Sequence, residues 1–398
     1  MLNRVDQDRT ECVLDLHGVE VGIDRDDAAS IIGFRDRLAD HEPLDQSHAY
    51  QSAPAAISVC GRYASYYPTF RQVLLPMNRR ERAGRQHEML ARTWPGPAPR
   101  RHHVGVDIAM TLPTMLPHGR HEVLAWCGKV DEGPWSSLAV PERVTYTSHS
   151  QTVQLSAAAA LTERVRLWTT LVVLPAHDEV QVAKDLASVD RLCEGRLTVG
   201  IGVGGRHQDY RAIGGDFTRR WQRMDDQVAR MRRIWAQEPP FEGADPVGPP
   251  PVQPGGPPFV AGVIGPKALA RAARWAVGVD DPSAITAVDT AALAAQRQRV
   301  LEAWKEAGRD EQPHFSSSLW YALGANAKEQ LARYVYDYMK IFDEGFARDL
   351  ASAAAVHSPG ALREAMASAQ EAGCDEFFLV PTTTDPDELD RTREALDL

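Results

Sequence analysis

The regular alternation of short apolar runs with helical stretches after His103 is the feature that most constrains the fold of this chain. Each apolar run is short enough for one strand, and nearly all of the runs are separated by a segment with helical periodicity. Strands that alternate with helices in this way build a parallel sheet. The expected strands cover residues 103–109, 136–141, 164–175, 196–204, 259–263, 277–279, 314–323 and 376–381.

The number of these units predicts how the sheet is closed. Eight β/α units within roughly 300 residues match a (β/α)8 TIM barrel with insertions, and a doubly wound open sheet is the alternative. The clearest helical pattern begins near Phe217, where Trp221, Met224 and Val228 continue one apolar stripe at spacings of four and three. The predicted fold class is therefore α/β, with a closed barrel.

Residues 1–101 differ from the rest of the chain. Their apolar residues keep no period of 2 or 3.6 for more than a few positions, and only residues 55–59 read as a short strand. Residues 78–103 are basic and then rich in proline and glycine, which is typical of a linker. We therefore predict an N-terminal extension at 1–101, weakly ordered or without an assignable fold, and a barrel at 102–398.

Charge and cysteine content exclude several classes of function. The formal net charge is −10 without a long basic run, which argues against sequence-independent binding of nucleic acid. The sequence has no stretch of 18 apolar residues, so no membrane span is predicted. The five cysteines are far apart and form no C-x-x-C pair, so neither a metal site nor a disulfide framework is expected. We expect a cytoplasmic protein with a small-molecule substrate.

Gly200, Gly202 and Gly205 spell G-x-G-x-x-G directly after a strand-like run. A dinucleotide fingerprint needs a helix at its third glycine and an acidic residue at the end of the following strand. Here a polar segment with two more glycines follows, and the helix is expected only near residue 217. The acidic residues about 20 positions on, Asp225 and Asp226, lie inside that helix and not at a strand end. An NAD-dependent dehydrogenase is therefore the weaker interpretation. In a barrel, such glycines would end a strand on the catalytic face and let a flat ligand approach the backbone.

Residues 164–236 resemble the central segment of the luciferase-like monooxygenase superfamily. The resemblance rests on a strand, a Leu-Pro pair, a helix, the motif D-R-L-x-x-G-R, a Gly-rich strand and an Arg-bearing helix that ends in a tryptophan. Residues 255–278 and 372–389 resemble later segments of the family, so the similarity covers about residues 102–396. It implies a (β/α)8 barrel that uses FMN for oxygenation or coenzyme F420 for hydride transfer, and a homodimer is common in such a family. A barrel that binds a flavin without catalysis is a further alternative.

The resemblance also implies which residues hold the cofactor. The loop before the helix that starts at Pro266 corresponds to a phosphate-binding loop, and a helix N-terminus favours an anion. The end of the third strand corresponds to a bulge, often with a non-proline cis peptide, against one face of the flavin ring. The predicted cofactor-binding residues are Thr170, Leu171, Gly202, Gly204, Gly262, Val263, Ile264 and Gly265.

The catalytic residues are less clearly indicated. Relatives often show an acid followed by histidine at the end of the second strand, whereas this chain has Glu142 followed by Arg143. Glu142 is the predicted acid or base, with a salt-bridged Glu142 as the alternative. His149, in a loop expected on the catalytic face, and Asp107, expected near the end of the first strand and facing the barrel mouth, are further candidates. The substrate cannot be read from these residues.

Overall fold

The computed structural model describes residues 11–16, 19–24 and 105–398, which belong to two units that are treated separately here. In the first unit, β1 (Glu11–Leu16) and β2 (Val19–Asp24) form an antiparallel pair. The strand expected at 55–59 and the linker-like segment at 78–103 lie outside the described residues. The assignment of 1–101 as one extension therefore stays a prediction.

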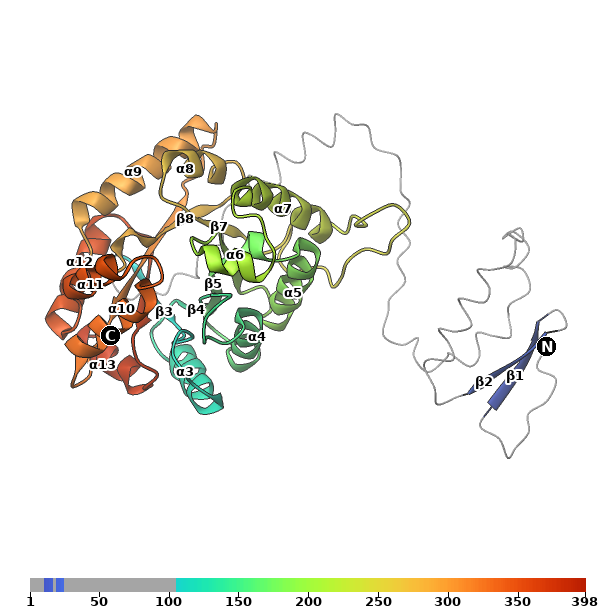
Figure 1. The fold of residues 1–398 in the computed structure, drawn as a ribbon, viewed down its shortest axis with the longest axis horizontal. Helices are drawn as coiled ribbons and strands as arrows, with labels where there is room; N and C mark the ends of the chain where they lie inside the picture. Colours follow the sequence, from blue (N-terminus) through green and yellow to red (C-terminus); the bar gives the residue numbers. More distant parts are fainter. Residues whose placement is uncertain (1–10, 17–18, 25–104) are drawn as a thin grey trace. The chain divides into compact units, whose positions relative to one another are not determined.

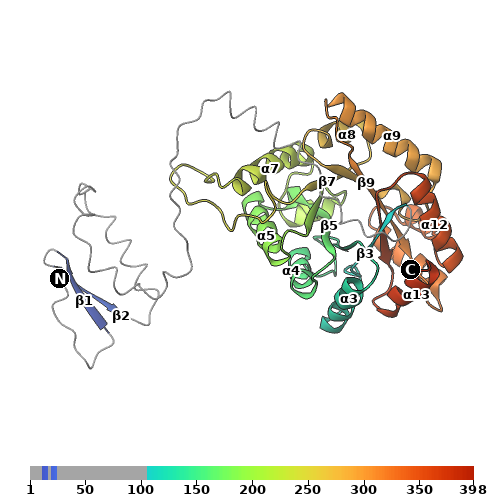
Figure 2. The same cartoon turned by 180° about the vertical axis from the view of Figure 1, so that it is seen from behind.

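The second unit is a closed barrel of eight strands, each paired in parallel with its neighbours (Figures 1 and 2). The last strand pairs with the first, which confirms the predicted TIM barrel and excludes the open sheet. The strands are β3 (Asp107–Thr111), β4 (Ser137–Val140), β5 (Arg166–Val173), β6 (Leu197–Gly202), β7 (Phe259–Gly262), β8 (Gly278–Asp281), β9 (His314–Tyr321) and β10 (Glu376–Pro381).

Helices surround this barrel in both views. They are α3 (Arg120–Glu132), α4 (Gln151–Leu161), α5 (Glu179–Leu192), α6 (His207–Ala212), α7 (Arg220–Trp235), α8 (Pro266–Ala272), α9 (Thr290–Glu306), α10 (Ala327–Met339), α11 (Glu344–Ala353), α12 (Pro359–Glu371) and α13 (Asp387–Ala395). The sequence patterns did not predict α4, α6, α11 or α13. Within the described part of the chain, no helix has both the length and the apolar character needed to cross a membrane.

The apolar stripe of α7 packs as its periodicity predicts, because Met224, Val228 and Met231 are all buried. The expected start of this helix was wrong by three residues. Phe217 lies before α7 and stacks on His207 of the unpredicted helix α6, with ring centroids 3.7 Å apart. The segment after the Gly-rich strand is therefore ordered by aromatic contacts that sequence periodicity does not reveal.

Asp107 is not at the barrel mouth, and that expectation is corrected here. The first strand runs from Asp107 to Thr111, later than expected, because the buried residues Ala109 and Met110 continue it toward the cavity. Asp107 therefore starts its strand, in register with Glu376, which starts β10. In a parallel barrel the starts of the strands lie at the end opposite the catalytic face.

Candidate functional site

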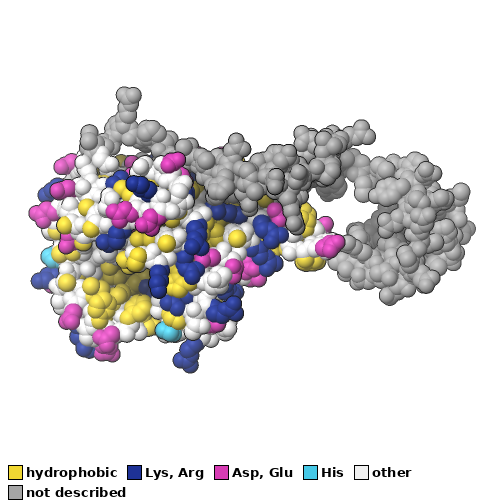
Figure 3. All heavy atoms as spheres, turned by 90° about the horizontal axis from the view of Figure 1, so that it is seen from above, with side chains coloured by type: hydrophobic (Ala, Val, Ile, Leu, Met, Phe, Trp, Pro, Cys, Tyr) yellow, Lys and Arg dark blue, Asp and Glu magenta, His cyan; other side chains and the backbone are white. Residues whose placement is uncertain are grey.

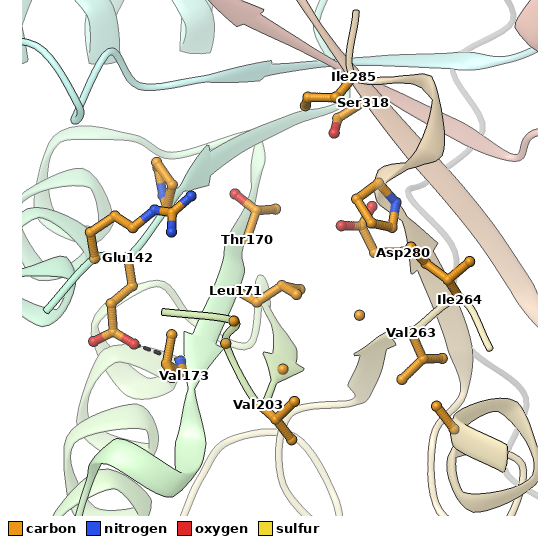
Figure 4. A pocket seen from close by; sticks show the side chains of 18 of the residues that line it. Glu142, Thr170, Leu171, Val173, Val203, Val263, Ile264, Asp280, Ile285 and Ser318 are labelled. Atoms are coloured by element: carbon orange, nitrogen blue, oxygen red, sulfur yellow. Dashed lines mark hydrogen bonds between the residues drawn. The ribbon is translucent and has the colours of Figure 1, made fainter. Parts of the chain in front are cut away.

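A cavity of about 960 Å³ lies at the carboxyl ends of the barrel strands (Figure 4). This is the end at which TIM barrels place their active sites, and the volume suits a cofactor together with a small ligand. Figure 3 shows one face of the unit, on which hydrophobic side chains gather around a hollow beside several Lys and Arg side chains. Strand ends supply much of the cavity lining: Thr111, Glu142, Thr170, Leu171, Gly202, Gly262, Asp280, Ser318, Trp320 and Phe378.

The structure brings most of the predicted site residues together. All eight predicted cofactor-binding residues line this cavity, and so does Glu142. His149 does not line it, because it lies on the loop before α4 with its ring exposed and its Nε2 3.0 Å from the carbonyl oxygen of His118. Asp107 is excluded from the cavity by its place at the start of β3. Of the three predicted catalytic residues, only Glu142 is therefore in reach of a ligand.

Strand β5 is irregular where the resemblance implied a bulge. The register of β5 against β6 shifts between Thr169 and Val172, and the peptide bond between Thr170 and Leu171 is cis. Leu171 lies on the wall of the cavity, as Figure 4 shows. A flat aromatic ring system can lie against an apolar side chain in this position.

The glycines around Leu171 make room for it. A Cβ atom on Gly262 would lie 1.9 Å from Cδ1 of Leu171, and one on Gly202 would lie 2.9 Å from the same atom. A Cβ on Gly200 would lie 2.2 Å from the carbonyl oxygen of Thr169. These distances are shorter than any carbon contact allows. Two glycines of the G-x-G-x-x-G motif therefore seat the bulge of the neighbouring strand, which explains the motif without a dinucleotide.

Both carboxylate oxygens of Glu142, which follows β4, are held by hydrogen bonds. The backbone N–H of Val173 donates to its Oε2 over 2.6 Å, and His177 Nε2 lies 2.8 Å from its Oε1. Burial lowers the pKa of His177, but the hydrogen bond and the negative charge of Glu142 outweigh burial and leave that pKa raised. Glu142 thus has the paired state that was the alternative prediction, and sequence reasoning missed its partner because His177 is 35 residues away.

Asp280 is the acidic residue of the site that sequence reasoning missed. It is the penultimate residue of β8, is buried, and directs its carboxyl group into the cavity (Figure 4). Burial raises the pKa of Asp280 to about 6, the hydrogen bond from Ser316 Oγ opposes the rise, and the charge of Asp281 adds to it. A carboxyl group with this pKa can accept or release a proton near neutral pH. The signal that could have found it is the Val-Asp-Asp-Pro sequence at the end of an expected strand.

The wall of the cavity formed by the β7–α8 loop, across Leu171 from Glu142, fits a phosphate group (Figure 4). Gly265 precedes α8, and a Cβ placed on it would meet no atom within 4 Å, so the space beside this backbone is open. Pro266 occupies the first turn of the helix, as expected. Lys267 and Arg271 also line the cavity, and Arg271 forms an ion pair with Asp225. Among the described residues, Lys267 has no such carboxylate partner, which leaves its charge available for an anion.

Comparison with known proteins assigns the chain to a family. Residues 108–395 match the model of the luciferase-like monooxygenase family, which covers well over half of the chain. The protein therefore belongs to this family, and its barrel and cavity are those of a family member.

The curated relatives match this chain over only 28–30% of their own length. An uncharacterized protein of Mycobacterium tuberculosis is 36% identical over 86 residues, which are 22% of this chain and 30% of that protein. The chain thus matches less than a third of the length of this relative.

Solved structures resemble the whole barrel at low identity. An F420-dependent secondary alcohol dehydrogenase, in complex with an F420-acetone adduct, has a TM-score of 0.59 at 18% identity and covers 74% of this chain and 99% of its own. The oxygenating constituent of 3,6-diketocamphane monooxygenase from Pseudomonas putida, in complex with FMN, has a TM-score of 0.55 at 15% identity, with coverages of 73% and 96%. At such identities the likeness establishes the fold.

Proposed function

We propose that this protein is an oxidoreductase that binds FMN or the deazaflavin coenzyme F420 in the barrel cavity and acts on a small organic substrate. The observation that carries the proposal is the position of Leu171. It lies on the cavity wall against glycines of β6 and β7. The backbone at Gly265 and the side chain of Lys267, which has no ion-pair partner among the described residues, line the same cavity. A flat ring that carries a phosphate-bearing side chain matches both features.

The residues present fit such a cofactor. Leu171 would support one face of the ring system, while the backbone at Gly265 and the Lys267 ammonium group would hold the phosphate. Bound FMN or F420 would supply the redox chemistry, namely oxygen activation for FMN and hydride transfer for F420. The protein would contribute binding, orientation and proton transfer.

Two acidic residues would take different roles. Asp280 can exchange a proton with a group in the cavity, because its carboxyl group faces the cavity and its pKa is raised to about 6. Glu142 already accepts two hydrogen bonds from Val173 and His177, so it would act by positioning the end of β5. The family membership and the cofactors of the two solved relatives support this assignment.

The first experiment is a pair of titrations of the full chain, one with FMN and one with F420, followed by cofactor fluorescence. We expect saturable micromolar binding of one cofactor, and the preferred one selects between oxygenation and hydride transfer. A folded protein that binds neither would refute the proposal. A protein that binds one of them but turns over no substrate with any reductant would be the non-catalytic flavin-binding barrel.

A further inference from the structure

An arginine in the cavity wall lacks an acidic partner. Arg143 follows β4 and lines the cavity, and its Nε donates to the hydroxyl of Tyr338 over 3.0 Å. Its guanidinium carbon lies 4.0 Å from the centroid of the Tyr338 ring, so stacking on the aromatic face fixes its position. No carboxylate of the described residues forms an ion pair with it. The terminal amino groups of Arg143 are therefore held in place and left without a negative charge to bind.

A second arginine increases the positive charge behind this wall. Arg206 is only 6% exposed, and its charge is shared with one carboxylate, Asp209, at 3.5 Å. That carboxylate also accepts hydrogen bonds from the backbone and side chain of Thr145. Burial lowers the pKa of Arg206, and the positive charge of Arg143 lowers it further. The two carboxylates on this side of the cavity are thus engaged elsewhere, Asp209 by Arg206 and Glu142 by His177, and neither forms an ion pair with Arg143.

The surface next to Arg143 is aromatic. Trp320 of β9 packs edge-on against Tyr334 and Tyr338 of α10, with ring centroids 5.7 Å and 5.0 Å apart, and the two tyrosine rings are stacked. All three residues line the cavity, and Phe342 extends the wall beyond α10. Such a wall contacts flat or bulky apolar molecules over a large area.

This positive site is separate from the place proposed for the cofactor phosphate. The loop with Val263 and Ile264 follows β7, whereas Glu142 and Arg143 follow β4, and β5 and β6 lie between them in the barrel. Figure 4 places Glu142 on one side of Leu171 and Val263 with Ile264 on the other. A ring lying on Leu171 with its phosphate at the β7 loop would leave Arg143 free for a second ligand.

We infer that Arg143 binds an acidic group of the substrate, and that the cavity selects apolar, largely planar organic acids. That the bound acid is the substrate rests on the proposed function, whereas the binding of an anion at Arg143 can be tested without it. Arginine suits the role because its planar donors match a carboxylate in pairs. The aromatic wall would hold the body of the molecule and Arg143 its charged end.

The test compares a charged with a neutral probe of the same shape. Binding of 2-naphthoate and of 2-naphthamide to the full chain, saturated with its cofactor, is measured by calorimetry. We expect the wild type to prefer 2-naphthoate at least tenfold, and the variant Arg143→Gln to lose this preference while keeping its affinity for 2-naphthamide. Arg333→Gln is the matched control, since Arg333 lies on α10 with 86% of its side chain exposed. Circular dichroism and melting curves check that each variant is folded.

Each other outcome has a defined meaning. A preference for 2-naphthoate that survives Arg143→Gln, or a cofactor-loaded protein that does not bind 2-naphthoate, overturns the inference. Competition between 2-naphthoate and the cofactor, abolished by Arg143→Gln, would assign the positive site to the cofactor and overturn its assignment to substrate. If neither FMN nor F420 binds, the proposed function fails, and the same comparison on the unloaded protein still decides whether Arg143 selects an anion.

Discussion

The Glu142 carboxylate joins the end of β4 to the end of β5, because it accepts the backbone N–H of Val173 over 2.6 Å and lies 2.8 Å from His177 Nε2. The family resemblance implied a histidine directly after the acid, and this chain has Arg143 there. Its histidine partner comes instead from the segment that precedes α5. The acid thereby supports the strand that carries Leu171, and Arg143 is free to face the cavity.

Replacing Glu142 by glutamine should destabilise the barrel in a pH-dependent way. The raised pKa of His177 contributes stability that is fully present below the unfolded pKa of about 6.5 and is lost as pH rises through the higher folded value. Glu142→Gln removes the charge but keeps an acceptor for Val173. We expect a loss of about 1 kcal/mol at pH 6 and a smaller loss at pH 9, measured by urea unfolding. Glu163→Gln, at an exposed position, is the control; equal losses at both pH values would contradict the pairing.

Replacing Asp280 by asparagine should stabilise the protein at neutral pH. The folded-state pKa of about 6 lies above the ordinary value of 3.8, so the unfolded state ionises first and stability falls as pH rises from 4 to 6. A shift of this size corresponds to about 3 kcal/mol. The melting temperature of Asp280→Asn should therefore exceed that of the wild type at pH 7.5, with little difference at pH 4.

The control for Asp280 is Asp310→Asn, because Asp310 is exposed. The same Asp280→Asn variant should lose turnover if its carboxyl group transfers a proton in the proposed reaction. A variant that is neither more stable at pH 7.5 nor less active would show that Asp280 is an ordinary ionised carboxylate.

The variant Gly262→Ala should be less stable than the wild type because its new methyl group collides with one side chain. The added Cβ would lie 1.9 Å from Cδ1 of Leu171, and such overpacking costs about 1–3 kcal/mol. Shortening the neighbour in the double variant Gly262→Ala with Leu171→Ala should recover most of that loss, as a double-mutant cycle of unfolding free energies would reveal. Additive losses would mean that Gly262 is needed for its backbone alone.

Gly265→Ala should separate phosphate binding from ring binding. The added methyl group enters open space and Gly265 has an ordinary extended backbone, with φ of −78°, so the melting temperature should not change. We expect the Kd of FMN to rise at least tenfold and the Kd of riboflavin, which lacks the phosphate, to stay constant. Gly360→Ala, another glycine with open space beside it, serves as the control. An equal effect on both flavins would place the phosphate elsewhere.

The sequence by itself determined the barrel. Alternating apolar runs and amphipathic helices predict a (β/α)8 fold because strand and helix periodicities are local properties of the chain, and family motifs at 164–236 indicated the irregular end of β5. The loop with Gly262 and Gly265 was predicted to bind phosphate from the family resemblance and from its place before a recognisable helix. The error at Asp107 came from the strand boundary, which a local pattern sets only to within a few residues.

Only the tertiary structure decided which of these residues meet. Leu171 contacts glycines on two other strands, Glu142 finds His177 35 residues away, and Asp280 faces the same cavity as Arg143. Closure of the barrel creates these contacts, because it brings the carboxyl ends of all eight strands to one rim regardless of their separation in the chain. The raised pKa of Asp280 and the uncompensated charge of Arg143 arise in the same way, since burial and missing partners are properties of the packed molecule.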